Sequence, residues 1–330
     1  MSLLTQASLI VTPNAVKASK LYSIIPSNGN GDMTVVRATT ATRVNSAGII
    51  ESVAANVPRL NYDVAGGCPS ILVEPLRTNR LLNSDVVVTQ SISTAGLQMA
   101  VSFYGTGTIT FSGTFVGSLV GTGVNNRVST VFTPTTGTLV LTVTGSVTKG
   151  QVETGAYATS YQPTLGTSVT RNADVIRKLG ISDLIGQTEG VMFVDANLQG
   201  ISLSDGLIYP IASLSLNNSG ANRLEVYRVN NNIFYDNIVN GVAQFAGNVF
   251  TITNFTGKIK IALSYKLNNV KVYINGSLVN TDTTALIPTC NDFNLGSLRA
   301  LTVFWGAGIN ACLLFKTQLT DAECIALTTL

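Results

Sequence analysis

The sequence predicts an all-β protein with more than one domain, and three observations lead to this conclusion. Short runs of β-branched and aromatic residues alternate with glycine, serine and threonine at a spacing of about ten residues, which is typical of sandwiches and barrels. Charged residues make up 11% of the chain, against about 25% in ordinary soluble proteins. The length of 330 residues exceeds the usual size of a single hydrophobic core. We therefore expect β-sandwich domains with polar, largely uncharged surfaces.

Residues 1–80 are predicted to form an extended arm that buries no core of its own. Prolines and turn-forming glycines recur throughout this segment, and no periodic pattern persists in it. A segment of this kind is usually laid against a partner or a neighbouring subunit. Its polar residues are interpreted as a buried ion-pair and hydrogen-bond set that holds an irregular backbone, with a ligand site as the alternative. These residues are Arg59, Glu74, Arg77 and Asn79.

Residues 81–170 are predicted to form a jelly-roll β-sandwich. Between residues 86 and 148 the only charged residue is Arg127. Two interpretations remain open: other subunits cover the sheet faces, or the surface is simply rich in serine and threonine. We favour the first, because bare, uncharged sheet edges promote aggregation.

Residues 171–187 change in composition and are predicted to be a linker, followed by a second sandwich at 188–330. Two alternating runs at 258–265 and 270–274 predict a pair of strands. The Asn275-Gly276 pair then predicts a tight hairpin, because both central residues of a type I′ turn need positive φ. The sequence Thr320-Asp321-Ala322-Glu323 predicts a capping box and a short terminal helix that packs through Ile325 and Leu327.

The C-terminal part of the chain, about residues 188–330, resembles the concanavalin A-like, laminin-G-type sandwich. The resemblance is carried by the strand at 259–265, the segment VYINGSLV at 272–279 and the ending LLFKTQLTDAE at 313–323. It implies a β-sandwich closed by a short C-terminal helix.

The first half, about residues 20–180, is similar to tailed-bacteriophage fibre and other virion-surface proteins, of the type found in phages of Bacteroidota. The resemblance implies a carbohydrate-binding-module-like jelly roll in the middle segment and a homotrimer on the virion, as tail fibre, head fibre or decoration. Other phage virion proteins are the implied partners. The motifs that carry it are DMTVVR at 32–37, NVPRLNY at 56–62, EPLRTN at 74–79, QVETG at 151–155 and RNAD at 171–174.

The composition excludes several functional classes. The chain has no histidine, so Ser-His-Asp and Cys-His nucleophile systems and histidine metal sites are ruled out. The four cysteines lack Cys-x-x-Cys spacing, and free, mostly buried thiols are expected. The net charge of +3 is too small to indicate a nucleic-acid partner.

No membrane insertion is expected either. The most apolar segment, Ala300 to Phe315, is 16 residues long, short of the about 20 that cross a bilayer. The N-terminus lacks the basic region and apolar core of a signal peptide. We expect the protein to be made in the cytoplasm of a bacterial host and carried on the virion surface.

The strongest enzymatic alternative is a polysaccharide-degrading enzyme with two carboxylates. Glu225 is the one glutamate without another explanation, and no sequence spacing places a second carboxylate beside it, so we expect no enzyme activity. No cofactor is required by the sequence. Calcium at the rim of a laminin-G-like domain is left open, with Asp195, Asp205 and Asp236 as candidate ligands.

Our leading hypothesis is a virion fibre protein whose C-terminal sandwich binds a host-surface glycan. Sugar binding calls for exposed aromatic rings beside polar groups, and Trp305 is interpreted as core because its neighbours are apolar. The alternative is a capsid or tail decoration protein that cements the virion without binding a ligand. The candidate ligand-binding residues are Tyr209, Tyr227, Tyr235 and Asp236.

Overall fold

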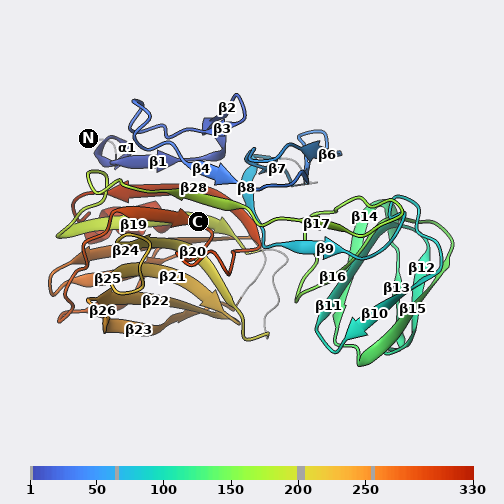
Figure 1. Cartoon of the computed structure of the whole chain (residues 1–330). Helices are drawn as coiled ribbons and strands as arrows, with labels where there is room; N and C mark the ends of the chain where they lie inside the picture. Colours follow the sequence, from blue (N-terminus) through green and yellow to red (C-terminus); the bar gives the residue numbers. More distant parts are fainter. Residues whose placement is uncertain (1–2, 64–66, 199–204, 254–256) are drawn as a thin grey trace.

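The computed structural model of the chain describes residues 3–63, 67–198, 205–253 and 257–330. It shows two lobes: a large sandwich that contains both ends of the chain, and a smaller sandwich built from its middle (Figure 1). The predicted all-β class is confirmed. Among the described residues, the only α-helices are α1 (Leu3–Gln6) and α2 (Asp321–Thr328). Neither of these helices has the length and apolar character needed to cross a membrane.

The first layer of the large sandwich is an eight-stranded sheet in the order β26-β25-β24-β19-β28-β8-β7, with β1 pairing along β28. The predicted hairpin joins β25 to β26, and Asn275 and Gly276 have the expected positive φ of 49° and 81°. The strands are β1 (Leu9–Val11), β7 (Leu60–Asn61), β8 (Ser70–Val73), β19 (Glu189–Asn197), β24 (Lys258–Lys266), β25 (Val270–Ile274), β26 (Ser277–Asp282) and β28 (Ala307–Phe315).

The second layer is a seven-stranded sheet in the order β23-β22-β21-β20-β27-β18-β4. Its last two strands come from outside the predicted 188–330 sandwich. The strands are β4 (Thr34–Val36), β18 (Val175–Lys178), β20 (Ile208–Ser215), β21 (Arg223–Val229), β22 (Asn232–Val239), β23 (Val242–Thr251) and β27 (Asp292–Leu295).

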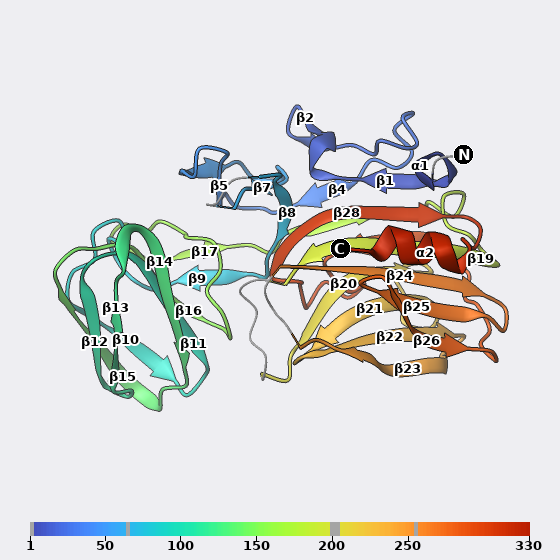
Figure 2. The same cartoon turned by 180° about the vertical axis from the view of Figure 1, so that it is seen from behind.

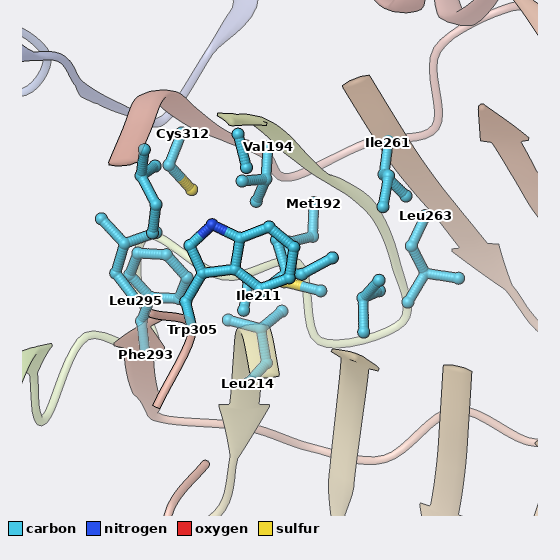
Figure 3. Close-up of a cluster of buried hydrophobic side chains, with 14 of the residues drawn as sticks. Met192, Val194, Ile211, Leu214, Ile261, Leu263, Phe293, Leu295, Trp305 and Cys312 are labelled. Carbon is cyan, nitrogen blue, oxygen red and sulfur yellow. The ribbon is translucent and has the colours of Figure 1, made fainter. Parts of the chain in front are cut away.

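The core of the large sandwich lies between these two sheets (Figure 3). Trp305 is fully buried there, so its interpretation as a core residue is confirmed. Its indole lies between side chains from both sheets. These side chains enter the core because side chains along a strand point alternately to its two faces. The labelled neighbours are Met192, Val194, Ile261, Leu263 and Cys312 from the eight-stranded sheet and Ile211, Leu214, Phe293 and Leu295 from the other.

The terminal helix α2 covers the outer face of the eight-stranded sheet (Figure 2). Its capping box is present: Thr320 Oγ1 accepts a hydrogen bond from the Glu323 amide, and the Glu323 carboxylate accepts one from the Thr320 amide. The expected packing residues were partly wrong. Leu327 is partly buried and packs against the sheet, whereas Ile325 is 39% exposed, and the buried residues of the helix are Cys324 and Thr328.

The smaller sandwich packs a four-stranded sheet, in the order β10-β15-β12-β13, against a three-stranded sheet, in the order β14-β11-β16. A separate core fills it, with Phe103 and Phe111 at its centre. Large apolar residues are nevertheless exposed on this lobe, among them Val116 at 79% and Val124 at 68%. The strands are β10 (Gln90–Ala95), β11 (Met99–Gly105), β12 (Thr108–Gly113), β13 (Gly117–Val120), β14 (Gly123–Phe132), β15 (Thr136–Thr144) and β16 (Val147–Thr154).

The N-terminal segment forms short strands rather than a free arm. Four of them, β1, β4, β7 and β8, complete the two sheets of the large sandwich, and Leu9, Val11 and Val73 enter its core. The segment therefore lies against its own chain. The remaining short elements are η1 (Pro13–Ala15), β2 (Val16–Lys17) with β3 (Lys20–Leu21), β5 (Ala41–Val44) with β6 (Ile50–Val53), and β9 (Arg77–Asn79) with β17 (Val169–Arg171).

The predicted linker at 171–187 is part of the large sandwich. Strand β18 lies between β27 and β4 in the seven-stranded sheet, with Ile176 buried and Arg177 partly exposed. Further along, Ile181 and Ile185 are also buried in the core. The linker interpretation was wrong because β18 has only four residues, and its two apolar residues followed by two basic ones show no alternation that would predict a strand.

Candidate functional site

The outer face of the seven-stranded sheet carries a group of aromatic and charged side chains. On β21, Leu224 and Val226 point into the core, so Arg223, Glu225 and Tyr227 point outward. On β22, Ile233 and Tyr235 enter the core, so Phe234 and Asp236 point outward. The strand register pairs Glu225 with Asp236 and Tyr227 with Phe234. We call the five outward residues, Arg223, Glu225, Tyr227, Phe234 and Asp236, the β21–β22 face.

Two carboxylates share two guanidinium groups on this face. Arg223 Nε lies 2.8 Å from Glu225 Oε2, and Arg223 Nη2 lies 2.8 Å from Asp236 Oδ2. Arg299, from the connection before β28, places Nη1 2.6 Å from Glu225 Oε1. Ser213 Oγ also donates to Glu225 Oε1, at 2.9 Å. The two positive and two negative charges balance, so the cluster carries no net charge.

The aromatic part of the face is the pair Tyr227 and Phe234. Their rings are nearly parallel, with an interplanar angle of 11° and centroids 5.5 Å apart. The Tyr227 hydroxyl donates to Asp236 Oδ1 at 3.0 Å. Burial raises the pKa of Tyr227, and the Asp236 carboxylate raises it further. The hydroxyl therefore remains a protonated donor at all physiological pH values.

Further polar side chains extend the face toward the sheet edge. Asn248 of β23 pairs with Phe234 and is exposed. Its Nδ2 donates to Asn232 Oδ1 at 3.3 Å, and Thr251 Oγ1 donates to the same oxygen at 2.7 Å. Amide and hydroxyl groups thus lie beside the aromatic pair, where a bound molecule could exchange hydrogen bonds with them.

This arrangement suits binding more than catalysis. Aromatic rings pack against apolar C–H surface, while neighbouring carboxylate, amide and guanidinium groups pair with hydroxyls, and a sugar offers both kinds of surface. A glycosidase needs one carboxyl to protonate the leaving oxygen and a second to act as base or nucleophile. Glu225 is buried under Arg299 and Asp236 is bound by Arg223 and Tyr227, so both carboxylates already have partners.

Two of the predicted ligand-binding residues, Tyr227 and Asp236, meet on this face, and the other two do not. Tyr235 points into the core, is fully buried, and stacks on Phe245 with centroids 4.3 Å apart. Tyr209 is 3% exposed, and its hydroxyl donates to Asp205. Neither ring offers a face to a ligand. The alternation of side chains along a strand explains the burial of Tyr235, which lies on the same side of β22 as the apolar Ile233.

Sequence reasoning missed Phe234, Arg223 and the pairing of Glu225 with Asp236. A signal for the pairing was present. The strands flank a turn at Asn230-Asn231, and residues at equal distances from a tight antiparallel turn face each other. Arg299 carried no such signal, because it lies in an irregular connection far along the chain.

Arg59 and Glu74 lie together in a second group of charged side chains, which is buried. Arg59 Nη2 lies 2.8 Å from Glu74 Oε2, and Arg59 also pairs with Asp174. Arg37 Nη1 lies 2.8 Å from Asp174 Oδ1, and Arg171 Nη2 lies 3.3 Å from Glu74 Oε2. We call these five residues, all of them buried, the arginine cluster. Burial alone would raise the pKa of Glu74, but Arg59 and Arg171 lower it to about 2.

Arg77 and Asn79 connect the large sandwich to the smaller one. Arg77 lies over the ring of Tyr157, 5.6 Å from its centroid, and its Nε is 3.9 Å from Glu153 Oε2. Asn79 Nδ2 donates to the carbonyl oxygens of Gly150 and Gln162 at 3.0 and 2.8 Å. The Asn79 side chain thus joins the backbone of β16 to the segment around residue 162.

The structure brings no metal site together at the expected aspartates. Asp195 accepts from Asn310, Asp205 from Tyr209, and Asp236 is held by Arg223. Within the described ranges, no group of three or more cysteine, aspartate or glutamate side chains could hold an ion.

The four cysteines are free, as the sequence predicts. Cys68 is exposed and the other three are buried. Burial raises the pKa of the Cys290 thiol to about 12.

Comparison of the sequence with protein-family models and with curated proteins finds no match. Among solved structures, the chain is similar to the CBM40 domain of the Ruminococcus gnavus IT-sialidase bound to α2,3-sialyllactose, at 18% identity and a TM-score of 0.36 over 44% of this chain and 84% of that chain. It is also similar to domain 4 of AbnA, a GH43 extracellular arabinanase from Geobacillus stearothermophilus, in complex with arabinotriose, at 16% identity and a TM-score of 0.37 over 52% and 80%. The binding domain of Botulinum neurotoxin DC in complex with rat synaptotagmin II matches at 15% identity and a TM-score of 0.36 over 48% and 40%. Each of these likenesses covers only about half of this chain.

Proposed function

We propose that this protein is a non-catalytic bacteriophage virion fibre that binds a host-surface glycan through the β21–β22 face. The observation that carries the proposal is the parallel pair Tyr227 and Phe234 beside two carboxylates and two guanidinium groups. The ring pair offers apolar contact to a sugar ring, and the charged groups offer hydrogen bonds to its hydroxyls. The resemblance of the first half to virion-surface proteins supports the virion role.

Weak individual binding is part of the proposal. The face is shallow and its charges are already paired, so one copy would hold a sugar only loosely. Several copies on one virion would convert weak contacts into firm adhesion, because each further binding event becomes intramolecular. A homotrimer would supply three copies, and the exposed valines of the smaller sandwich, such as Val116 and Val124, favour contact with other chains.

A cement or decoration role is the second candidate, and the same exposed apolar residues favour it. In that role the smaller sandwich would pack on the capsid or tail, and the β21–β22 face would bind nothing. The two roles differ in one measurable property, which is affinity for polysaccharide.

The test measures binding of the purified full chain to immobilised bacterial surface polysaccharides. Tyr227→Ala and Phe234→Ala are expected to weaken binding about ten-fold or more, since each removes an aromatic contact near the centre of the site. Tyr227→Phe keeps the ring and should retain most of the affinity. Tyr22→Ala, at a partly buried tyrosine of the N-terminal segment, is the matched control and should bind as the wild type does.

Point variants are better suited to this test than deletion of residues 188–330. Strands β1 and β8 pair with β28, and β18 pairs with β27, so the deletion would remove a strand partner from each of the three. Equal binding by wild type and Tyr227→Ala would reject the assignment of the β21–β22 face. Absence of binding to every polysaccharide would favour the cement role.

A further inference from the structure

A second candidate site lies in a cleft between the two lobes, away from the β21–β22 face. The cleft has a volume of about 270 Å³ and is lined by the β5–β6 hairpin, strands β8, β11 and β14, the segment 158–161 and the start of β28. This volume is below the range of about 300–1,000 Å³ that drug-sized ligands occupy. The cleft is therefore suited to one small molecule or a single sugar unit. We refer to it as the interlobe cleft.

Arg127 contributes the one uncompensated charge in this cleft. It lies on the outer face of the three-stranded sheet, where the register places it opposite Tyr104. Its Nη2 donates to Ser102 Oγ at 2.7 Å, and its buried Nε has no hydrogen-bond partner. Within the part of the chain that the structure describes, no carboxylate lies within ion-pair distance of its guanidinium.

The other charged side chains that line the described part of the cleft are neutralised by partners. Arg43 Nη2 lies 2.7 Å from Glu51 Oε1. Glu74 is held by Arg59 and Arg171 of the arginine cluster. The cleft therefore has a net positive charge that comes from Arg127 alone, on a lobe where this arginine is the only charged residue between positions 86 and 148.

The remaining lining is polar and uncharged. Asn61, Asn197, Ser70 and Tyr104 carry amide and hydroxyl groups into the wall of the cleft. A guanidinium matches a carboxylate in geometry and charge, while amides and hydroxyls match the hydroxyls of a sugar. We propose that the interlobe cleft binds a sugar that carries a carboxylate, with Arg127 pairing with that carboxylate.

The test compares two probes that differ at one position: methyl β-glucuronide, which has a carboxylate at C6, and methyl β-glucoside, which has a hydroxymethyl group there. Binding to the full chain is measured by ligand-observed NMR titration. We expect the glucuronide to bind at least about ten-fold more tightly than the glucoside, since the charge-assisted pair is lost with the carboxylate. The preference should shrink as salt is added, because ions screen the pair.

Variants connect this preference to Arg127. Arg127→Gln should reduce glucuronide affinity about ten-fold or more and leave the weaker glucoside binding unchanged. Arg127→Lys keeps the positive charge but lacks the planar guanidinium, so its glucuronide affinity should lie between those of the wild type and Arg127→Gln. Arg80→Gln removes the same charge from a hollow elsewhere on the smaller lobe and should bind as the wild type does. Thermal unfolding of each variant shows whether it is folded.

The proposal stands independently of the β21–β22 face, so Tyr227→Ala should leave glucuronide binding unchanged. Equal binding of the two probes, or equal glucuronide affinity of wild type and a folded Arg127→Gln, would overturn it. A stronger response to methyl β-glucoside 6-sulfate than to the glucuronide would overturn the carboxylate assignment as well. Failure of the chain to bind either probe would also refute the proposal.

Discussion

Three guanidinium groups and two carboxylates are buried together in the arginine cluster, where the N-terminal segment, the return from the smaller sandwich and the large sandwich converge. Burying such charges is costly unless each has a partner of opposite sign. Here Asp174 bridges Arg37 and Arg59, and Glu74 bridges Arg59 and Arg171. Each carboxylate thus holds two segments together, and loss of either leaves buried positive charge without compensation.

Glu74 should make stability depend on pH in the acid range. Its pKa is about 2 in the folded protein, below the ordinary value of 4.5. As the pH falls, the Glu74 carboxylate therefore takes up a proton at a higher pH in the unfolded chain than in the folded protein. The stabilisation that this carboxylate contributes above pH about 4.5 is lost as the pH falls toward about 2. Glu74→Gln should lower the free energy of unfolding at pH 7 by about 3–5 kcal/mol.

Urea denaturation between pH 2 and pH 7 measures this effect. The difference between wild type and Glu74→Gln should narrow as the pH falls, since the wild-type carboxylate becomes protonated. Glu189→Gln, at a partly exposed glutamate whose ion pair with Lys266 lies near the surface, is the control and should differ little from wild type. A wild-type-to-Glu74→Gln difference that stays constant across this range would contradict the role of the buried carboxylate.

Residue roles were only partly predictable from the sequence. Tyr227 and Asp236 were identified because they lie in a strand-like, polar stretch, and the structure places both on the outer face. Tyr235 was included wrongly because a tyrosine looks amphipathic wherever it occurs, and only the side of the strand decides its burial. Arg127 was noticed as an isolated charge, but its place in a cleft depends on contacts between lobes that no local pattern encodes.

At the scale of single elements, the sequence predicts local structure correctly where several neighbouring residues favour the same backbone geometry. The Asn275-Gly276 turn and the capping box at Thr320 each combine several residues that favour one backbone geometry, and both occur as predicted. Strand β18 has only four residues, which do not alternate in polarity, and the sequence therefore predicts a linker there. Short strands such as β4 and β7 have their register set by distant partners, so their own sequence gives little information.

Thr320→Ala should lower the free energy of unfolding by about 1 kcal/mol, the usual cost of losing an N-cap. The substitution removes the acceptor for the Glu323 amide at the start of α2. The helix then covers the outer face of the eight-stranded sheet less firmly, through Cys324 and Thr328. Urea denaturation measures the difference. Thr317→Ala, at an exposed threonine just before the cap, should have no measurable effect, and equal losses in both variants would reject the capping role.

At the scale of the whole molecule, the sequence predicted two sandwiches and a terminal helix, and the structure has them. It did not predict that the large sandwich would be assembled from three separate parts of the chain. Residues 3–80 and 171–187 have few apolar residues in any one run, so neither shows that it completes a sheet. Their strands join the two sheets through β27 and β28, which residues 188–330 contribute.

The exposed apolar surface of the smaller sandwich leads to a prediction about assembly. Val116, Val120 and Val124 are 79%, 58% and 68% exposed, on a lobe with one charged residue between positions 86 and 148. We expect chains to associate through this lobe, so that light scattering gives three times the chain mass of 34.7 kDa. Val116→Lys combined with Val124→Lys should shift the mass toward one chain. A monomeric wild type at high concentration would contradict this expectation.

The location of glycan binding tests the central claim most directly. The full chain, labelled for NMR, is titrated with a fragment of a neutral polysaccharide that it binds, and backbone amide shifts are followed. We predict that the largest shifts fall on β21, β22 and β23, around Tyr227, Phe234 and Asn248, and that Tyr227→Ala abolishes them. Shifts confined to other strands, or no shifts at saturating sugar, would contradict the account of the β21–β22 face as the adhesive surface.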